Sequence, residues 1–164
     1  MLRAELDVSG LNRGLDRVPT QIVAAIQTKM NAVTINLQQH VIHDKLHGQV
    51  LKQRSGRLAK SIQRLVQRLG EIVTGLVFSS GDVKYARIHE YGGRTAPHDI
   101  VPKKAEALAF AIGGKTVFAK IVHHPGSEIP ERSFLRSSLA DQATEIAAGL
   151  KKAALEGAKR ALNQ

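Results

Sequence analysis

The chain has no cysteine and no tryptophan, and its other aromatic residues are few. Its 164 residues include four Phe, two Tyr and five Pro. Without cysteine, disulfides and thiolate chemistry are excluded, and a zinc site would have to use His and carboxylate ligands only. The scarcity of aromatic side chains argues against a stacking platform for single-stranded nucleic acid.

Acidic residues are also scarce, and long apolar runs are missing. Lys and Arg number 24 against 14 Asp and Glu, which gives a formal charge of +10. This excess implies an acidic neighbour, either nucleic acid or the negative surface of another protein. No apolar run approaches the roughly 20 residues of a membrane helix, and the first 20 residues lack a signal-peptide core. The length suits one domain that spans 1–164. The absence of cysteine fits folding in the cytosol.

The N-terminal part predicts an arm followed by an amphipathic helix. Residues 1–18 contain scattered apolar positions, and Leu6 to Leu11 suggest a short strand and a turn. Residues 19–47 form the helix, since Pro19 suits its first turn. Apolar residues then recur at spacings of three and four, which places them on one helix face: Ile22, Ile26, Met30, Val33, Leu37 and Val41.

The middle of the chain predicts a basic loop, strands and a short helix. Residues 48–62 are basic, and Gly56 interrupts them before one or two helical turns. Residues 63–69 and 71–79 predict two antiparallel strands around Gly70, because large apolar residues alternate in the second of them. A short helix over 84–91 then ends at Gly92-Gly93.

A hairpin is predicted near residue 113. Leu108, Phe110 and Ile112 alternate with alanines, and Gly113-Gly114 supplies a two-residue loop. In this register Phe110 faces Val117 and Leu108 faces Ala119, so the larger groups share one sheet face. We expect the opposite, alanine-rich face to receive a helix.

The last element predicted is a long helix over 131–162. Phe134 and Leu135 at its start are expected to anchor it to the sheet, and Gly149 and Gly157 weaken its interior by about 1 kcal/mol each relative to Ala. The fold class predicted is α+β. We expect an antiparallel sheet of about four strands within 63–122, packed against the two long helices.

Catalytic and metal sites are not indicated. His43 and His47 have the i, i+4 spacing of zinc ligands, with His40 and Asp44 nearby, but the general-base glutamate of the metalloprotease motif is missing. Gly113-Gly114-Lys115-Thr116 lacks the upstream glycine of a phosphate-binding loop. No Ser-His-Asp arrangement is readable either. We therefore expect neither an enzyme nor a cofactor.

Two basic groups have alternative explanations. Arg54, Arg57, Lys60, Arg64 and Arg68 form a dense basic segment, and Arg132 and Arg136 flank Phe134. These side chains either contact phosphates without reading sequence or form salt bridges with other proteins. No known DNA-reading motif stands out.

Three ordered segments carry a resemblance. They are Arg54-Ser55-Gly56-Arg57-Leu58, the stretch from Tyr85 through Ile88-His89-Glu90-Tyr91 to Gly93, and the stretch Pro130 to Arg136. Together they resemble the tail-completion proteins of tailed bacteriophages, the group related to the minor tail protein Z of lambda-like phages. Ser133 departs from the pattern, because that family usually has proline before the phenylalanine.

The resemblance implies a structural virion protein that completes the tail and joins it to the head connector, in a ring of six copies. Implied partners are a connector or stopper protein and a tail terminator or tail-tube protein. Glu90 is expected to form an ion pair with an arginine of residues 54–57. The implied interface residues are Arg54, Arg57, Leu58, Tyr85, Glu90, Tyr91, Arg132, Phe134, Leu135 and Arg136. The alternative is a small basic DNA-binding or packaging accessory protein.

Overall fold

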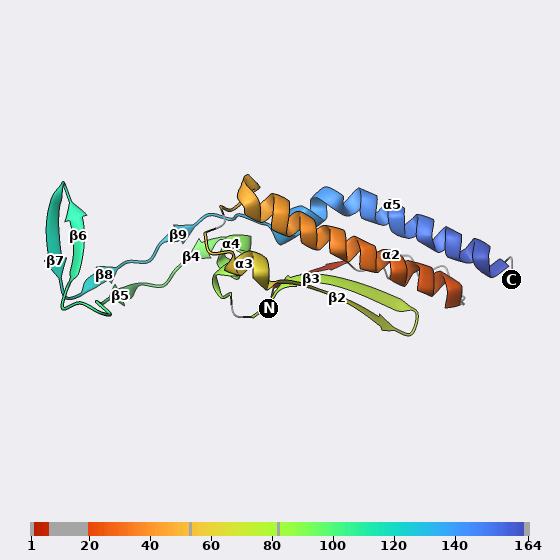
Figure 1. The fold of residues 1–164 in the computed structure, drawn as a ribbon, viewed down its shortest axis with the longest axis horizontal. Coiled ribbons are helices and arrows are strands. Elements are labelled where there is room, and N and C mark those ends of the chain that lie inside the picture. Colours follow the sequence, from red (N-terminus) through yellow and green to blue (C-terminus); the bar gives the residue numbers. More distant parts are fainter. Residues whose placement is uncertain (1, 7–19, 53, 82, 163–164) are drawn as a thin grey trace.

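Two long helices cover one face of a small sheet, and a narrow arm extends from one end of this body (Figure 1). The computed structural model describes residues 2–6, 20–52, 54–81 and 83–162. The turn predicted between Leu6 and Leu11 lies almost wholly outside these residues. The α+β class is confirmed, with the sheet smaller than predicted.

Helix α2 (Thr20–Gln39) continues into a wider π-helical segment, η1 (His40–Gln49). The helix predicted over 19–47 is thus present. All six apolar residues of its predicted face are buried, from Ile22 to Val41. The backbone leaves helical geometry at His47 and at Gly48, where φ is +122°. A positive φ suits glycine, so Gly48 allows the chain to turn into the basic loop.

Helix α5 (Leu135–Leu162) runs antiparallel to α2 and packs along it. It begins at Leu135, later than the predicted residue 131. Gly157 is placed where a Cβ would lie 2.8 Å from Cα of Ile22, so glycine allows the two backbones to approach closely. Gly157, which was predicted to weaken the helix, is therefore needed for the close packing of α5 on α2. Ile146 and Leu150 of α5 join Met30 and Val73 in one apolar cluster.

The sheet has three antiparallel strands in the order β1-β3-β2. They are β1 (Leu2–Leu6), β2 (Ile62–Leu69) and β3 (Ile72–Ser79). Helix α2 packs on β3 and β2. Burial alternates along β3, with Val73, Gly75 and Val77 facing the helices. The antiparallel pairing of β2 with β3 confirms the two strands predicted around Gly70. One face of β3 is buried as predicted, whereas β2 is mostly exposed beyond Ile62.

Two short helices lie at the end of the body from which the arm extends. Helix α3 (Arg57–Ser61) supplies the helical turn expected after Gly56, and α4 (Tyr85–Tyr91) is the short helix expected over 84–91. Gly92 follows α4 with a φ of +68°, and a Cβ there would lie 2.9 Å from the backbone nitrogen of Glu131. Glycine at 92 thus lets the chain leave α4 beside the segment that leads into α5.

The arm consists of two chain segments that pair in three short ladders. From the body outward these are β4 (Gly93–Arg94) with β9 (Glu128–Ile129), β5 (His98–Ile100) with β8 (Val122–His124), and β6 (Leu108–Ile112) with β7 (Lys115–Ala119). The hairpin register is confirmed, since Phe110 pairs with Val117 and Leu108 with Ala119.

The hairpin is placed differently from the prediction. It stands at the far end of the arm and does not join the three-stranded sheet, and its alanine face receives no helix among the described residues. Alternation along a strand fixes which residues share a face, but it does not fix what covers that face. The prediction of about four strands in one sheet over 63–122 was therefore wrong in this detail.

No helix in the described part of the chain is long and apolar enough to cross a membrane.

Candidate functional site at the base of the arm

Glu90 on α4 connects the base of the arm to the start of α5. Its side chain is only 1% exposed. One carboxylate oxygen accepts hydrogen bonds from the backbone N–H groups of Phe134 (2.8 Å) and Leu135 (2.9 Å). The other accepts from the Arg136 N–H at 2.9 Å. These N–H groups have no partner within the helix, and the helix dipole favours a negative charge at this end. Glu90 thus caps α5 from a distant segment.

The ion-pair partner of Glu90 is Arg136, not an arginine of residues 54–57. Arg136 Nε lies 3.1 Å from the Glu90 carboxylate, and Arg136 Nη2 donates to the backbone carbonyl of Glu90 and to the Glu131 carboxylate, both at 2.8 Å. The guanidinium also lies 4.5 Å from the ring centroid of Tyr91. Partial desolvation opposes its charge, but the hydrogen bonds to both carboxylates raise the pKa of Arg136. The sequence-based expectation was therefore wrong about the partner.

Ser133, which departs from the family pattern, takes part in the same cap. Its hydroxyl donates to Glu90 at 2.8 Å and accepts from the Ser137 N–H at 3.2 Å. Proline offers no hydroxyl for these bonds. In this chain serine at 133 therefore adds to the hydrogen bonding of the first turn.

Three of the predicted interface residues lie in the interior. Phe134 (0% exposed) and Leu135 belong to the apolar cluster that contains Ile62 and Val77 of the sheet, as expected of helix anchors. Glu90 is equally buried. These residues hold one copy of the chain together, and the exposed candidates lie around them.

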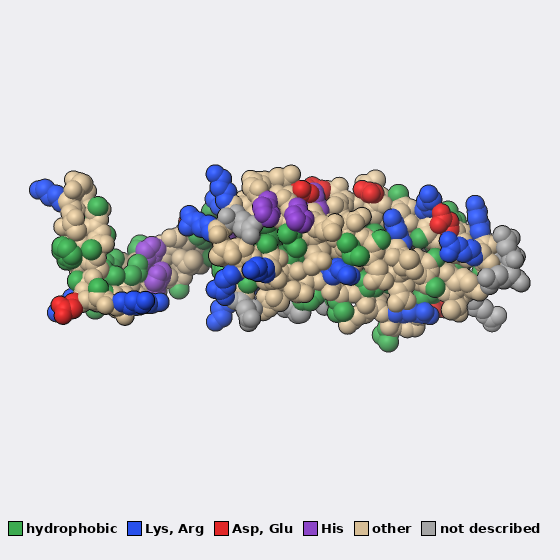
Figure 2. All heavy atoms as spheres, viewed as in Figure 1, with side chains coloured by type: hydrophobic (Ala, Val, Ile, Leu, Met, Phe, Trp, Pro, Cys, Tyr) green, Lys and Arg blue, Asp and Glu red, His purple; other side chains and the backbone are tan. Residues whose placement is uncertain are grey.

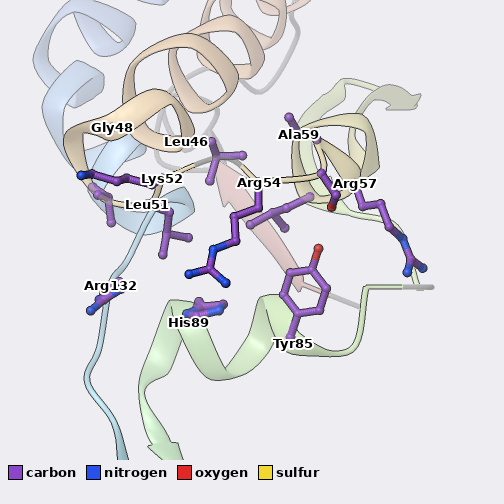
Figure 3. A pocket seen from close by; sticks show the side chains of 14 residues that line it. Leu46, Gly48, Leu51, Lys52, Arg54, Arg57, Ala59, Tyr85, His89 and Arg132 are labelled. Atoms are coloured by element: carbon purple, nitrogen blue, oxygen red, sulfur yellow. The ribbon is translucent and has the colours of Figure 1, made fainter. Parts of the chain in front are cut away.

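An open cleft of about 940 Å³ lies beside this cap, between the basic loop, α3 and α4 (Figure 3). Apolar side chains of Leu46, Leu51, Leu58 and Ala59 line part of it. The cations around it come from the loop and from the segment before α5: Lys52, Arg54, Arg57 and Arg132. In Figure 3 the Arg54 side chain points toward the ring of His89, and Arg132 lies on the same side of the cleft as His89. The Arg57 side chain points away from the cleft.

The cleft brings together residues predicted from separate segments. Arg54, Leu58, Tyr85 and Arg132 all line it, although nearly 80 residues separate the first from the last. Tyr91 and Arg136 instead form the adjacent cap. With the described residues, the side chains of Lys52, Arg54, Arg57 and Arg132 make no hydrogen bond or ion pair.

His89 is a residue of this site that the sequence analysis did not single out. Its ring meets Tyr85 edge-on, with centroids 6.0 Å apart. Burial and the nearby charge of Arg132 both disfavour the charged form of His89 and lower its pKa. Its Nδ1 is buried without a hydrogen-bond partner among the described residues. The i, i+4 spacing of Tyr85 and His89 on a short helix is the signal that places both at one surface.

The other histidines do not gather into a metal centre. His43 and His47 stack at 6.0 Å, and His40 bonds to both Asp44 and Asp141. Within the described ranges, no group of three or more His, Asp or Glu residues could hold a metal ion. Lys45 also pairs with Asp141 at 2.6 Å, so this cluster fastens η1 to α5. Hydrogen bonds from Lys45 and His40 hold the pKa of Asp141 below its usual value.

The two histidines before Pro125 have separate partners on the arm. His123 pairs with Asp99, and His124 stacks on His98 at 5.0 Å. Neighbouring residues of a strand point to opposite faces, which explains the separation. Gly113 and Gly114, with φ of +55° and +80°, form the hairpin turn and no phosphate-binding loop.

Comparison with known proteins returned no matching family model, no matching curated protein and no matching solved structure.

Proposed function

We propose that this chain is a non-enzymatic structural protein of a tailed-phage virion, which completes the tail and joins it to the head connector within a neck ring. Its partners would be further copies of itself, a connector or stopper protein, and a tail terminator or tail-tube protein. It would be assembled in the cytoplasm of the bacterial host.

The observation that carries the proposal is the meeting of the three resembling segments at one place. Glu90 of the second segment caps the helix that the third begins. The first segment lines the cleft together with Tyr85 of the second and Arg132 of the third. Segments that must pack against one another are expected to recur together, so their contact favours a shared fold over three unrelated short matches.

The arm supports an assembly role. Its tip exposes large apolar side chains, including Phe118 at 69% and Ile112 at 61%. Figure 2 shows apolar and cationic side chains on this projection, well apart from the body. A two-stranded hairpin is marginally stable alone in water, and exposed apolar patches mark contact sites. A ring also needs two unlike surfaces on each copy, and the arm tip and the long helices of the body are unlike surfaces (Figure 1).

Deleting this chain from the phage tests the proposal. Electron microscopy is expected to show complete heads and complete tails that fail to join. Mass analysis of wild-type virions is expected to find the chain at a ring-like copy number. Normal joined particles without the protein would overturn the proposal.

The unpaired cations favour a second candidate, a small basic DNA-binding or packaging accessory protein. Arg54 and Arg132 at the cleft and the exposed Arg64 on β2 could neutralise phosphates. This function predicts affinity for duplex DNA that falls steeply with salt. Salt-tolerant binding to connector or tail-tube protein, with weak binding to DNA, would favour the joining role instead.

A further inference from the structure

The cleft at the base of the arm combines cationic and apolar lining. On the cationic side, the side chains of Lys52, Arg54 and Arg132 make no hydrogen bond or ion pair with the described residues. No Asp or Glu is among the described residues that line the cleft. Positive charge that no carboxylate of the lining balances favours an anion as the occupant.

The apolar lining indicates which class of anionic ligand fits the cleft. Leu46, Leu51 and Leu58 contribute side chains to the same cleft. A phosphate backbone gains nothing from apolar walls, whereas a peptide can place an apolar side chain against them. Apart from Tyr85, no Phe, Tyr or Trp lines the cleft, so it offers little for stacking bases.

We propose that this cleft binds an acidic peptide segment of a partner protein, in which an Asp or Glu stands next to a large aliphatic residue. Arg54 and Arg132 bind the carboxylate, and the aliphatic side chain packs against Leu51 and Leu58. Arginine suits this role because its planar guanidinium can donate two hydrogen bonds to one carboxylate. The proposal rests on the proposed function, since it describes the surface by which a neck partner would be held.

Short fluorescein-labelled peptides provide the probe, with binding to the full chain measured by fluorescence anisotropy. One peptide repeats Glu-Leu pairs, a second replaces each Glu by Gln, and a third replaces each Leu by Gly. We expect the second and third to bind at least about tenfold more weakly than the first, because each lacks one of the two groups that the cleft recognises. Equal binding of the Glu-Leu and Glu-Gly peptides would overturn the proposal, since it would indicate charge attraction alone.

Matched variants locate the binding. Arg54→Glu and Arg132→Glu are each expected to weaken Glu-Leu peptide binding by about tenfold to a hundredfold, the loss typical of a charge-assisted hydrogen bond. Arg64→Glu makes the same charge change on β2, away from the cleft, and is expected to leave the affinity within about twofold. Unchanged circular dichroism and melting would verify that each variant is folded. A loss in Arg64→Glu as large as in Arg54→Glu would contradict a defined site.

Duplex DNA is the other possible occupant of the cleft, and its binding is compared with that of the Glu-Leu peptide. If DNA binds more tightly than the Glu-Leu peptide and Arg54→Glu abolishes this binding, the cleft is a phosphate site and the proposal fails. The deletion phenotype is independent of these measurements. Unjoined heads and tails together with a cleft that binds no peptide would overturn only the cleft proposal, whereas peptide binding with normal particles would overturn only the joining role.

Discussion

The body of this chain buries its large apolar side chains, whereas the arm leaves several of them exposed. In the body, Met30, Val41 and Phe134 are fully buried between helices and sheet. In the arm, Ile112 and Phe118 stay largely exposed although they lie in regular strands. Burial of apolar area is the main favourable term in folding. The body therefore buries its large apolar side chains within the chain, while those of the arm tip remain available for contact with another molecule.

The largest expected effect comes from emptying the body core. Phe134→Ala should lower the free energy of unfolding by about 3–5 kcal/mol, because it removes a fully buried ring and leaves a cavity. Phe118→Ala at the arm tip is the matched control and should stay within about 0.5 kcal/mol. Chemical denaturation measures both. Equal losses at the two positions would erase the distinction between body and arm.

The joint between the two regions is tested by Glu90→Gln. Removing the charge weakens the bonds to Phe134, Leu135 and Arg136, and we expect a loss of about 2–3 kcal/mol. The control is Glu131→Gln, which also contacts Arg136 but is half exposed, and it should cost less than about 1 kcal/mol. A Glu90→Gln variant as stable as the control would show that the cap contributes little.

Substitutions at two glycines of α5 test the contact between α2 and α5. A Cβ on Gly157 would meet backbone atoms of α2, so Gly157→Ala should destabilise by about 1–2 kcal/mol. A Cβ on Gly149 would meet only the flexible end of Lys29, so Gly149→Ala should be neutral or stabilise by up to about 1 kcal/mol. Thermal melts of both variants would reveal the opposite signs, and the same sign for both would contradict the observed packing.

The smallest effect is expected at Asp141, whose low pKa reflects bonds from Lys45 and His40. A carboxyl with a depressed folded-state pKa stabilises the chain above its unfolded value, about 3.9, and loses this contribution as the pH falls through the folded value. Asp141→Asn should therefore be slightly less stable than wild type at neutral pH. The difference should shrink as the solution is acidified below that range. A difference that grows in acid would contradict this sign.

Local pattern predicted much of this molecule and missed its long-range pairings. The buried face of α2 and the register around Gly113-Gly114 follow from spacing within short segments, so both were predictable. The location of the hairpin depends on where its neighbours leave the body, which periodicity does not encode. The partnership of Glu90 with Arg136 joins residues 46 apart, and several arginines were equally plausible partners in the sequence.

The residues of the candidate site were likewise predicted in part, but their arrangement was not. Arg54, Leu58, Tyr85 and Arg132 were singled out from their segments, but only the fold places them around one cleft. His89 was missed because its i, i+4 spacing from Tyr85 places the two side chains at one surface but does not by itself indicate a site. Its buried nitrogen and the nearby Arg132 become visible only in three dimensions.

Amide hydrogen exchange of the hairpin, residues 108–119, tests most directly whether the arm is an assembly element of the virion. In the free chain we expect rapid exchange at the tip and slow exchange in α2 and α5, because exposed ladders open at little cost. In intact joined particles the same hairpin amides should become strongly protected. Hairpin amides that exchange equally fast in the free chain and in particles would contradict the account.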